Sequence, residues 1–141
     1  MKKLSCFSIL LLFIFNVYAQ NEEIHPIDVE LDQCLEKSEN YTTNGMIDCF
    51  VKARNSWESE LNKDYSLLLI GLTSEQGELL KAAQNQWIKL RDSENEFSDL
   101  YINSLGGTLS AIEAASNKAT IIKNRVLDLK YYLSLNSSNE K

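Results

Sequence analysis

The sequence predicts an all-α fold, an antiparallel helical bundle of one short and three long helices with one disulfide. Apolar residues recur at steps of three and four along most of the chain, which is the spacing of helices buried along one face. No alternating Val, Ile and Thr run and no Asn-Gly hairpin suggests a strand. Short connections between long amphipathic helices favour antiparallel neighbours.

The first nineteen residues, MKKLSCFSILLLFIFNVYA, have the three parts of a secretory signal peptide. Lys2 and Lys3 give the positive start, residues 9–15 the apolar run, and the stretch ending at Ala19 the cleavage site. The apolar run is short for a membrane span, so cleavage after Ala19 is favoured over a retained anchor. We therefore expect a periplasmic or secreted protein that has no membrane segment after cleavage.

Three further segments follow the signal peptide. We expect a polar leader over 20–27, the helical domain over 28–134 and a disordered tail over 135–141. A lipoprotein is disfavoured because Cys6 precedes the apolar run rather than following it.

Loss of the signal peptide changes the charge and the number of cysteines. Lys2 and Lys3 leave with no acid, so the formal charge goes from −6 to −8. Cys34 and Cys49 remain, and an even pair in an exported chain predicts one disulfide, with two free thiols as the alternative. The closed loop of about 15 residues would stabilise the fold by about 3 kcal/mol in the chain-entropy treatment. The acidic balance disfavours nucleic-acid and anionic-membrane binding and is compatible with a cationic partner.

The helices follow one another with short breaks. The first is expected over about 27–38, followed by the linker SENYTTNG. The second carries its apolar residues from Met46 to Leu68, and Gly71 ends it. Thr73 and Gln76 have the spacing of a capping box that starts the third.

The third helix is expected over about 74–103. Its apolar side holds Leu80, Ala83, Trp87, Leu90, Phe97 and Tyr101. Paired glycines end it, because glycine permits the positive φ of a sharp reversal. The fourth helix has near-heptad apolar spacing from Leu109 to Leu133.

Catalytic chemistry has little support in the sequence. The single His25 lies in the polar leader, away from any nucleophile pattern. One histidine and two cysteines fifteen residues apart match no zinc spacing, and Glu96 and Asp99 are better explained as part of a solvated acidic face. We expect no metal, no cofactor and no enzyme activity.

Several short motifs remain, which share no obvious chemistry. They are Leu61-Asn62-x-x-Tyr65, then Ala83-Gln84-x-x-Trp87-x-x-x-Arg91-Asp92, then Gly106-Gly107-Thr108, and finally Arg125. Together with Cys34 and Cys49, and in this order, they resemble the LprI-like lysozyme-inhibitor domain family over about residues 34–133. That resemblance implies an exported helical domain with disulfides, most of whose relatives have no known function. For the namesake branch it implies a protein that binds and inhibits lysozyme.

The sequence departs from the family pattern at two positions. Family members commonly have cysteines where this chain has Asn95 and Asn117. Both are replaced together, as expected if the two cysteines pair. One covalent link between the third and fourth helices is therefore missing.

The stripe formed by Gln84, Trp87 and Arg91 at positions i, i+3 and i+7 admits two interpretations. The favoured one is a polar anchor at a helix junction near the Gly-Gly turn, with Arg91 donating to open carbonyls or pairing with an acid of a neighbouring helix. The other is a surface that contacts a ligand.

Two functional hypotheses follow. The first is an inhibitor that binds a cationic lysozyme, with the SENYTTNG linker or the NSLGGT turn as the occluding loop. The second is a cell-envelope interaction domain whose protein partner covers exposed aromatic residues among Phe97, Tyr101, Tyr131 and Tyr132, although core packing is expected for most of them. An enzyme ranks third. The oligomeric state is left open.

Overall fold

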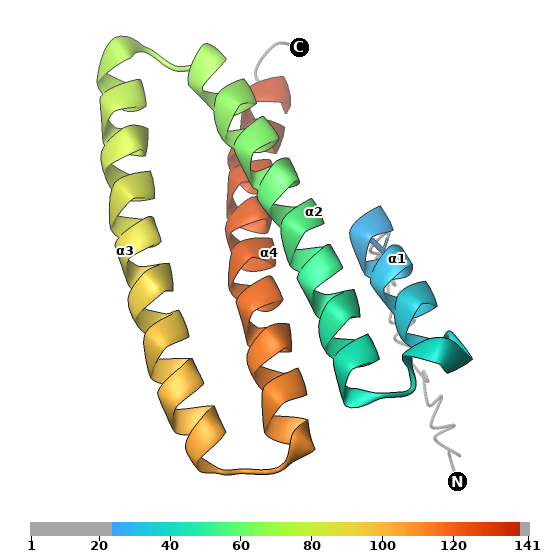
Figure 1. Ribbon diagram of the computed structural model, residues 1–141. Coiled ribbons are helices and arrows are strands. Elements are labelled where there is room, and N and C mark those ends of the chain that lie inside the picture. Colours follow the sequence, from blue (N-terminus) through green and yellow to red (C-terminus); the bar gives the residue numbers. More distant parts are fainter. Residues whose placement is uncertain (1–23, 139–141) are drawn as a thin grey trace, which may run out of the picture.

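The computed structural model describes residues 24–138, with side chains described as far as residue 135. It contains α1 (Pro26–Leu35), a short 3-10 helix η1 (Ser38–Asn40), α2 (Thr43–Ile70), α3 (Ser74–Ser104) and α4 (Thr108–Ser138) (Figure 1). There is no strand within these residues, so the predicted all-α fold of one short and three long helices is confirmed. The predicted signal peptide lies outside the described residues. At the other end, α4 runs into the segment expected to be a disordered tail.

The helices are ordered α1, α2, α4 and α3 across the molecule (Figure 1). Consecutive helices run in opposite directions, as predicted, so α2 and α4 run parallel to each other. These two share the main interface, α1 packs on α2, and α3 packs on α4. Although α3 directly follows α2 in the chain, it is attached chiefly to α4.

The hydrophobic core lies along the contact between α2 and α4. Its members recur at steps of three, four or seven residues on each helix, which places them on one face. They are Ala53, Trp57, Leu61 and Leu68 from α2, and Ile122, Val126 and Leu129 from α4. From α3, only Leu80 and Trp87 pack at the edge of this cluster, and both are half-buried.

The disulfide between Cys34 and Cys49 holds α1 against the start of α2, as predicted. Asn40 supports this corner, because its side-chain amide donates to the carbonyl of Cys34 at 2.8 Å. Gly45 permits the close approach of the linker. A Cβ at Gly45 would lie 2.7 Å from the Cα of Asn40.

The start of α3 and the turn before α4 also match expectation. The Thr73 hydroxyl accepts from the backbone N–H of Gln76, and the Gln76 side chain accepts from the N–H of Thr73, which completes the capping box. Gly106 and Gly107 have φ of 70° and 86°, the conformation for which glycine is suited.

Most of the apolar side of α3 is not in the core. Leu90, Phe97 and Tyr101 were expected to face the interior, yet they are 57%, 62% and 55% exposed. Tyr131 and Tyr132 on α4 are exposed as well, so core packing was the wrong expectation for these aromatic residues. The physical reason is the helix order: α2 covers α4, and nothing in the described chain covers the outer side of α3. None of the helices between residues 24 and 138 is long and apolar enough to cross a membrane.

Candidate functional site

The motif residues of α3 meet Arg125 of α4 in the middle of the molecule. Gln84 is buried, and its side-chain oxygen accepts a hydrogen bond from Nε of Arg125 at 3.0 Å. The guanidinium carbons of Arg91 and Arg125 lie 5.3 and 6.0 Å from the centre of the Trp87 ring. Both distances are within the range of a cation–π contact. The cluster therefore joins α3 to α4 through one polar pair and one shared aromatic ring.

The position of this cluster corrects two expectations. Trp87 does not lie near the Gly-Gly turn, since about 20 residues of helix, or about 30 Å, separate it from Gly107. Arg91 does not reach a helix end or an acid of a neighbouring helix. Instead it pairs with Asp92, the next residue in its own helix, at 2.7 Å. Arg125 and not Arg91 is the arginine that crosses between helices.

The other motif residues have varied environments. Leu61 is buried in the core and Tyr65 packs half-buried against it, whereas Asn62 and Ala83 are exposed. Gly106, Gly107 and Thr108 form the turn into α4. The structure thus brings Gln84, Trp87, Arg91 and Arg125 together but leaves the remaining motif positions apart from them.

Asn95 and Asn117, at the two positions where the family resemblance implies cysteines, line one cavity between α3 and α4. Its volume is about 240 Å³, and Ser98, Thr120 and Asn124 also line it.

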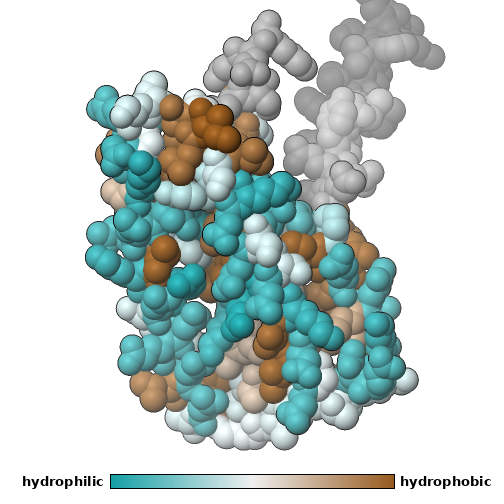
Figure 2. Space-filling view, turned by 45° about the horizontal axis from the view of Figure 1, so that its top comes forward, coloured by the Kyte–Doolittle hydropathy of each residue, from teal (hydrophilic) through white to brown (hydrophobic). Residues whose placement is uncertain are grey.

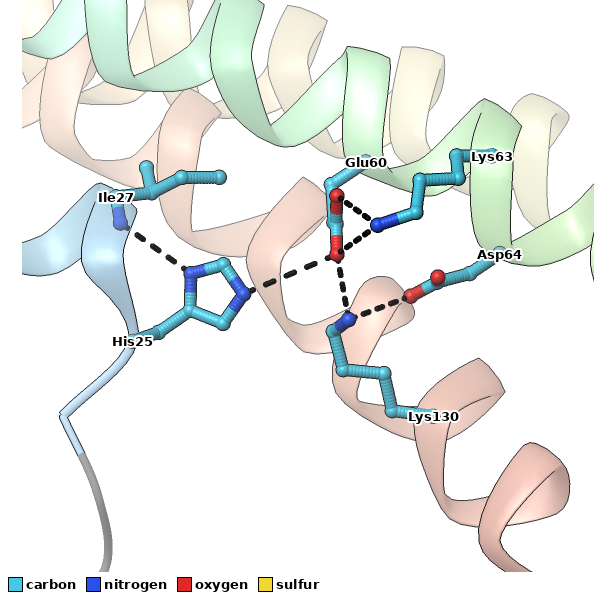
Figure 3. Close-up of polar contacts among 6 residues, drawn as sticks. All are labelled: His25, Ile27, Glu60, Lys63, Asp64 and Lys130. Atoms are coloured by element: carbon cyan, nitrogen blue, oxygen red, sulfur yellow. Dashed lines mark hydrogen bonds and ion pairs between the residues drawn. The ribbon is translucent and has the colours of Figure 1, made fainter. Parts of the chain in front are cut away.

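A second polar cluster joins α2, α4 and the start of α1 (Figure 3). Lys130 of α4 reaches Glu60 at 2.6 Å and the buried Asp64 at 3.0 Å, and Lys63 pairs with Glu60 from outside at 3.2 Å. His25 approaches the same carboxylate at 4.0 Å.

His25 was assigned to the polar leader, but it belongs to the folded domain. Its Nδ1 accepts from the N–H of Ile27, which makes it the N-cap of α1, and its ring lies 4.4 Å from the ring of the buried Trp57. Pro26 at the first helical position was the sequence signal for this cap.

The charges of this cluster change the acidity of two members. The hydrogen bond from Lys130 holds the pKa of Glu60 below its usual value near 4.5. Burial acts to lower the pKa of Lys130, but hydrogen bonds to Glu60 and Asp64 outweigh it, so this pKa is raised. Both shifts favour the charged forms of the pair, as in a structural ion pair.

Among the described residues, no three His, Cys, Asp or Glu side chains are placed to hold a metal ion. Asp99, one of the acids considered for a cation, instead pairs with Lys118 of α4 at 2.8 Å.

The two loops considered for partner binding lie at the same end of the bundle, opposite the α2–α3 turn (Figure 1). We call this the loop end, formed by residues 38–45 and 103–109. Leu105 and Leu109, on either side of the Gly-Gly turn, are 66% and 79% exposed. Tyr41 in the linker is also exposed, and its hydroxyl donates to the carbonyl of Glu36 at 3.0 Å, which fixes its direction.

Acidic side chains surround the linker half of the loop end. Residues 36–48 contain three exposed acids, Glu36, Glu39 and Asp48, and a single basic residue, Lys37. Tyr41 among these acids, and the two leucines at the same end of the bundle, are exposed side chains suited to contact with another protein.

Comparison with known proteins gives the family. No curated protein matches the chain. A solved structure of an uncharacterized protein from Burkholderia thailandensis is similar, with a TM-score of 0.75 and 25% identity over 80% of this chain. The similarity covers 55% of that protein, so this chain spans about half its length. The family model described as lysozyme inhibitor LprI matches residues 34–129. The chain therefore belongs to the LprI lysozyme-inhibitor family.

Proposed function

We propose that this protein is an exported inhibitor that binds lysozyme through its loop end. The observation that carries the proposal is the pair of exposed leucines on the α3–α4 turn, in a chain that belongs to a lysozyme-inhibitor family. Leu105 and Leu109 project from a glycine turn at the end of two long helices, where a narrow protrusion can enter a cleft.

The chemistry of the loop end suits such a target. Lysozymes are usually cationic, so a chain with a formal net charge of −8 after cleavage would attract them and accelerate association at low salt. Glu36, Glu39 and Asp48 would meet the basic rim of the enzyme, while the leucines occupy its cleft. Because the cleft of a lysozyme contains its catalytic carboxylates, apolar side chains inserted there would exclude the sugar substrate.

Proteins of this family are typically exported, and cleavage of residues 1–19 after Ala19 would place this one in the periplasm or outside the cell. In this proposal the protein is a binding protein without enzyme activity of its own. An exported interaction domain with another protein partner is the second candidate, favoured by the exposed Phe97, Tyr101, Tyr131 and Tyr132.

A lysozyme clearing assay on bacterial cell walls tests the proposal. The purified protein should inhibit stoichiometrically at low salt and less well at 0.3 M salt. Leu105→Asp and Leu109→Asp should each abolish inhibition while leaving the melting temperature unchanged, because both side chains lie in solvent.

Leu127→Asp is the matched control, since Leu127 is an exposed leucine on α4 away from the loop end. It should inhibit as the unmodified protein does. No inhibition of cationic lysozymes of several classes would refute the proposal, and equal loss in all three variants would refute the assigned surface.

A further inference from the structure

One side of α3 carries an exposed apolar stripe that the proposed function does not use. Leu79, Ala83, Leu90, Phe97 and Tyr101 are all exposed. At about 100° per residue they cluster roughly 120° around the helix from Gln84 and Ile102, the buried residues that face α4. We call these five residues the α3 stripe. Figure 2 shows hydrophobic side chains breaking the hydrophilic surface, most densely at the end where α2 turns into α3.

The spacing of the α3 stripe is symmetric about Leu90. Ala83 and Phe97 lie seven residues before and after it, and Leu79 and Tyr101 lie eleven residues before and after it. If a second copy of α3 lies antiparallel on the first, with a two-fold axis at Leu90, every member meets an apolar partner. Phe97 then faces Ala83 of the other copy, and Tyr101 faces Leu79.

The two ends of the stripe are also complementary in shape. At one end the rings of Phe97 and Tyr101 stack with centres 5.7 Å apart and project into solvent. At the other end, next to Ala83, there is an apolar cavity of about 450 Å³ between α3, α4 and the end of α2. Leu72, Leu79, Leu80, Ala83, Arg125 and Tyr132 are among the residues that line it.

The antiparallel arrangement brings a large aromatic side chain to each cavity. Phe97 of one copy arrives over Ala83 of the other, where the absence of a large side chain leaves the cavity accessible. Arg125 on the cavity wall can face the ring, which adds a cation–π attraction to the burial of apolar area.

Two polar residues beside the α3 stripe also agree with this register. Gln86 and Glu94 lie four residues before and after Leu90 and are exposed on the same side of α3. In the two-fold arrangement the Gln86 amide faces the Glu94 carboxylate of the other copy and can donate to it. No two like charges on the stripe are opposed, although each chain is acidic overall.

We propose that the protein forms a homodimer through the α3 stripe, with α3 antiparallel to its counterpart and Phe97 of each copy in the cavity of the other. The interface is isologous, because the same surface of both copies forms it and the assembly closes at two chains. The stripe does not include Leu105 or Leu109, although in this register the loop end lies level with the α2–α3 turn of the other copy.

Sedimentation velocity and light scattering on the purified protein, from micromolar to millimolar concentration, test the dimer directly. Leu90→Glu places two carboxylates on the two-fold axis and should weaken self-association about 100-fold or more. Leu127→Glu, on an exposed part of α4 outside the stripe, should not change it. A chain that is monomeric over the whole range, or a dimer unaffected by Leu90→Glu, would overturn the proposal.

A size exchange tests the register. Ala83→Phe should prevent dimerisation by filling the cavity, and Phe97→Ala should weaken it by removing the occupant. The double variant Ala83→Phe/Phe97→Ala should restore a dimer, since each large side chain then meets a small one. Failure of the restoration in variants that melt as the parent does would show that a different surface or register is used.

Salt separates this dimer from lysozyme binding. Two acidic copies repel each other, so the dimer should strengthen with added salt, whereas lysozyme inhibition should weaken. Leu90→Glu should leave inhibition intact, and Leu109→Asp should leave the dimer intact.

Discussion

The two sides of α4 hold their neighbours by different means. Toward α2, α4 presents Ile122, Val126 and Leu129, which are at most 2% exposed. Toward α3 it presents Arg125 and Lys118, which make polar contacts and each line a cavity. Because apolar burial is the main stabilising term in folding, we expect the contact with α2 to supply most of the stability. The polar contact positions α3 while leaving its apolar side exposed to solvent.

Paired substitutions of the two tryptophans test this difference most strongly. Trp57 is 1% exposed in the α2–α4 core, and Trp57→Ala should lower the free energy of unfolding by about 4 kcal/mol. Trp87 is half-buried at the α3–α4 contact, so Trp87→Ala should cost no more than about half as much. Urea denaturation followed by circular dichroism measures both. Equal costs would mean that α3 belongs to the same core as α2 and α4.

A disulfide between α3 and α4 should reduce the difference in stability between the α3–α4 contact and the α2–α4 contact. Asn95→Cys/Asn117→Cys places two thiols on the walls of one cavity and would close a loop of about 22 residues, worth about 3 kcal/mol. The oxidised variant should melt at a higher temperature than the parent, and its reduced form should not.

Intact mass before and after reduction shows whether the bond has formed, with the Cys34–Cys49 bond as an internal reference. A variant that forms the bond without gaining stability would indicate that α3 is already fixed by the Gln84–Arg125 contact.

Substitution of Lys130 tests the polar part of the α2–α4 contact. Lys130→Met leaves Glu60 and the buried Asp64 without their shared cation. Breaking such a pair costs several kcal/mol when it is fully buried, but Lys130 is 34% exposed, so about 2 kcal/mol is expected at pH 7.

The effect should depend on pH with a defined sign. The folded-state pKa of Glu60 is lowered, so its ionised form stabilises the fold above about pH 4.5, and this contribution is lost as pH falls through the lowered value. The difference between parent and variant should therefore be largest near neutral pH and shrink in acid. Urea titrations at pH 7, 5, 4 and 3 measure it, and a constant difference would contradict the role assigned to Lys130.

The sequence predicted the positions of the helices better than it predicted which helices contact each other. The steps of three and four in α2 and α4 correctly identified Trp57, Leu61 and Val126 as one-sided apolar positions. The same pattern on α3 gave an apolar side but no information on what covers it. Leu90 and Phe97 were therefore assigned to a core that α2 and α4 complete without them.

The site was predicted in part for a similar reason. Gln84, Trp87 and Arg91 were identified as one stripe, because their spacing is a local property of a single helix. Their meeting with Arg125 depends on the pairing of α3 with α4, which spacing does not encode. His25 was missed because a short polar segment before a proline resembles a leader. Its contact with Trp57 exists only once α1 has folded back on α2.

The smallest effect expected is that of Arg91→Ala, which addresses whether the motif is an anchor or a contact surface. Arg91 contributes one cation–π contact to Trp87 and an ion pair to the exposed Asp92 in its own helix. Together these should be worth about 0.5–1 kcal/mol, or a fall in melting temperature of roughly 2–4 °C for a chain of this size. Arg125→Met should cost more, because it also leaves the buried Gln84 unpaired. If Arg91→Ala instead melts as the parent does and no longer inhibits lysozyme, the arginine would belong to the binding surface, and the α3–α4 contact would depend on Arg125 and Gln84.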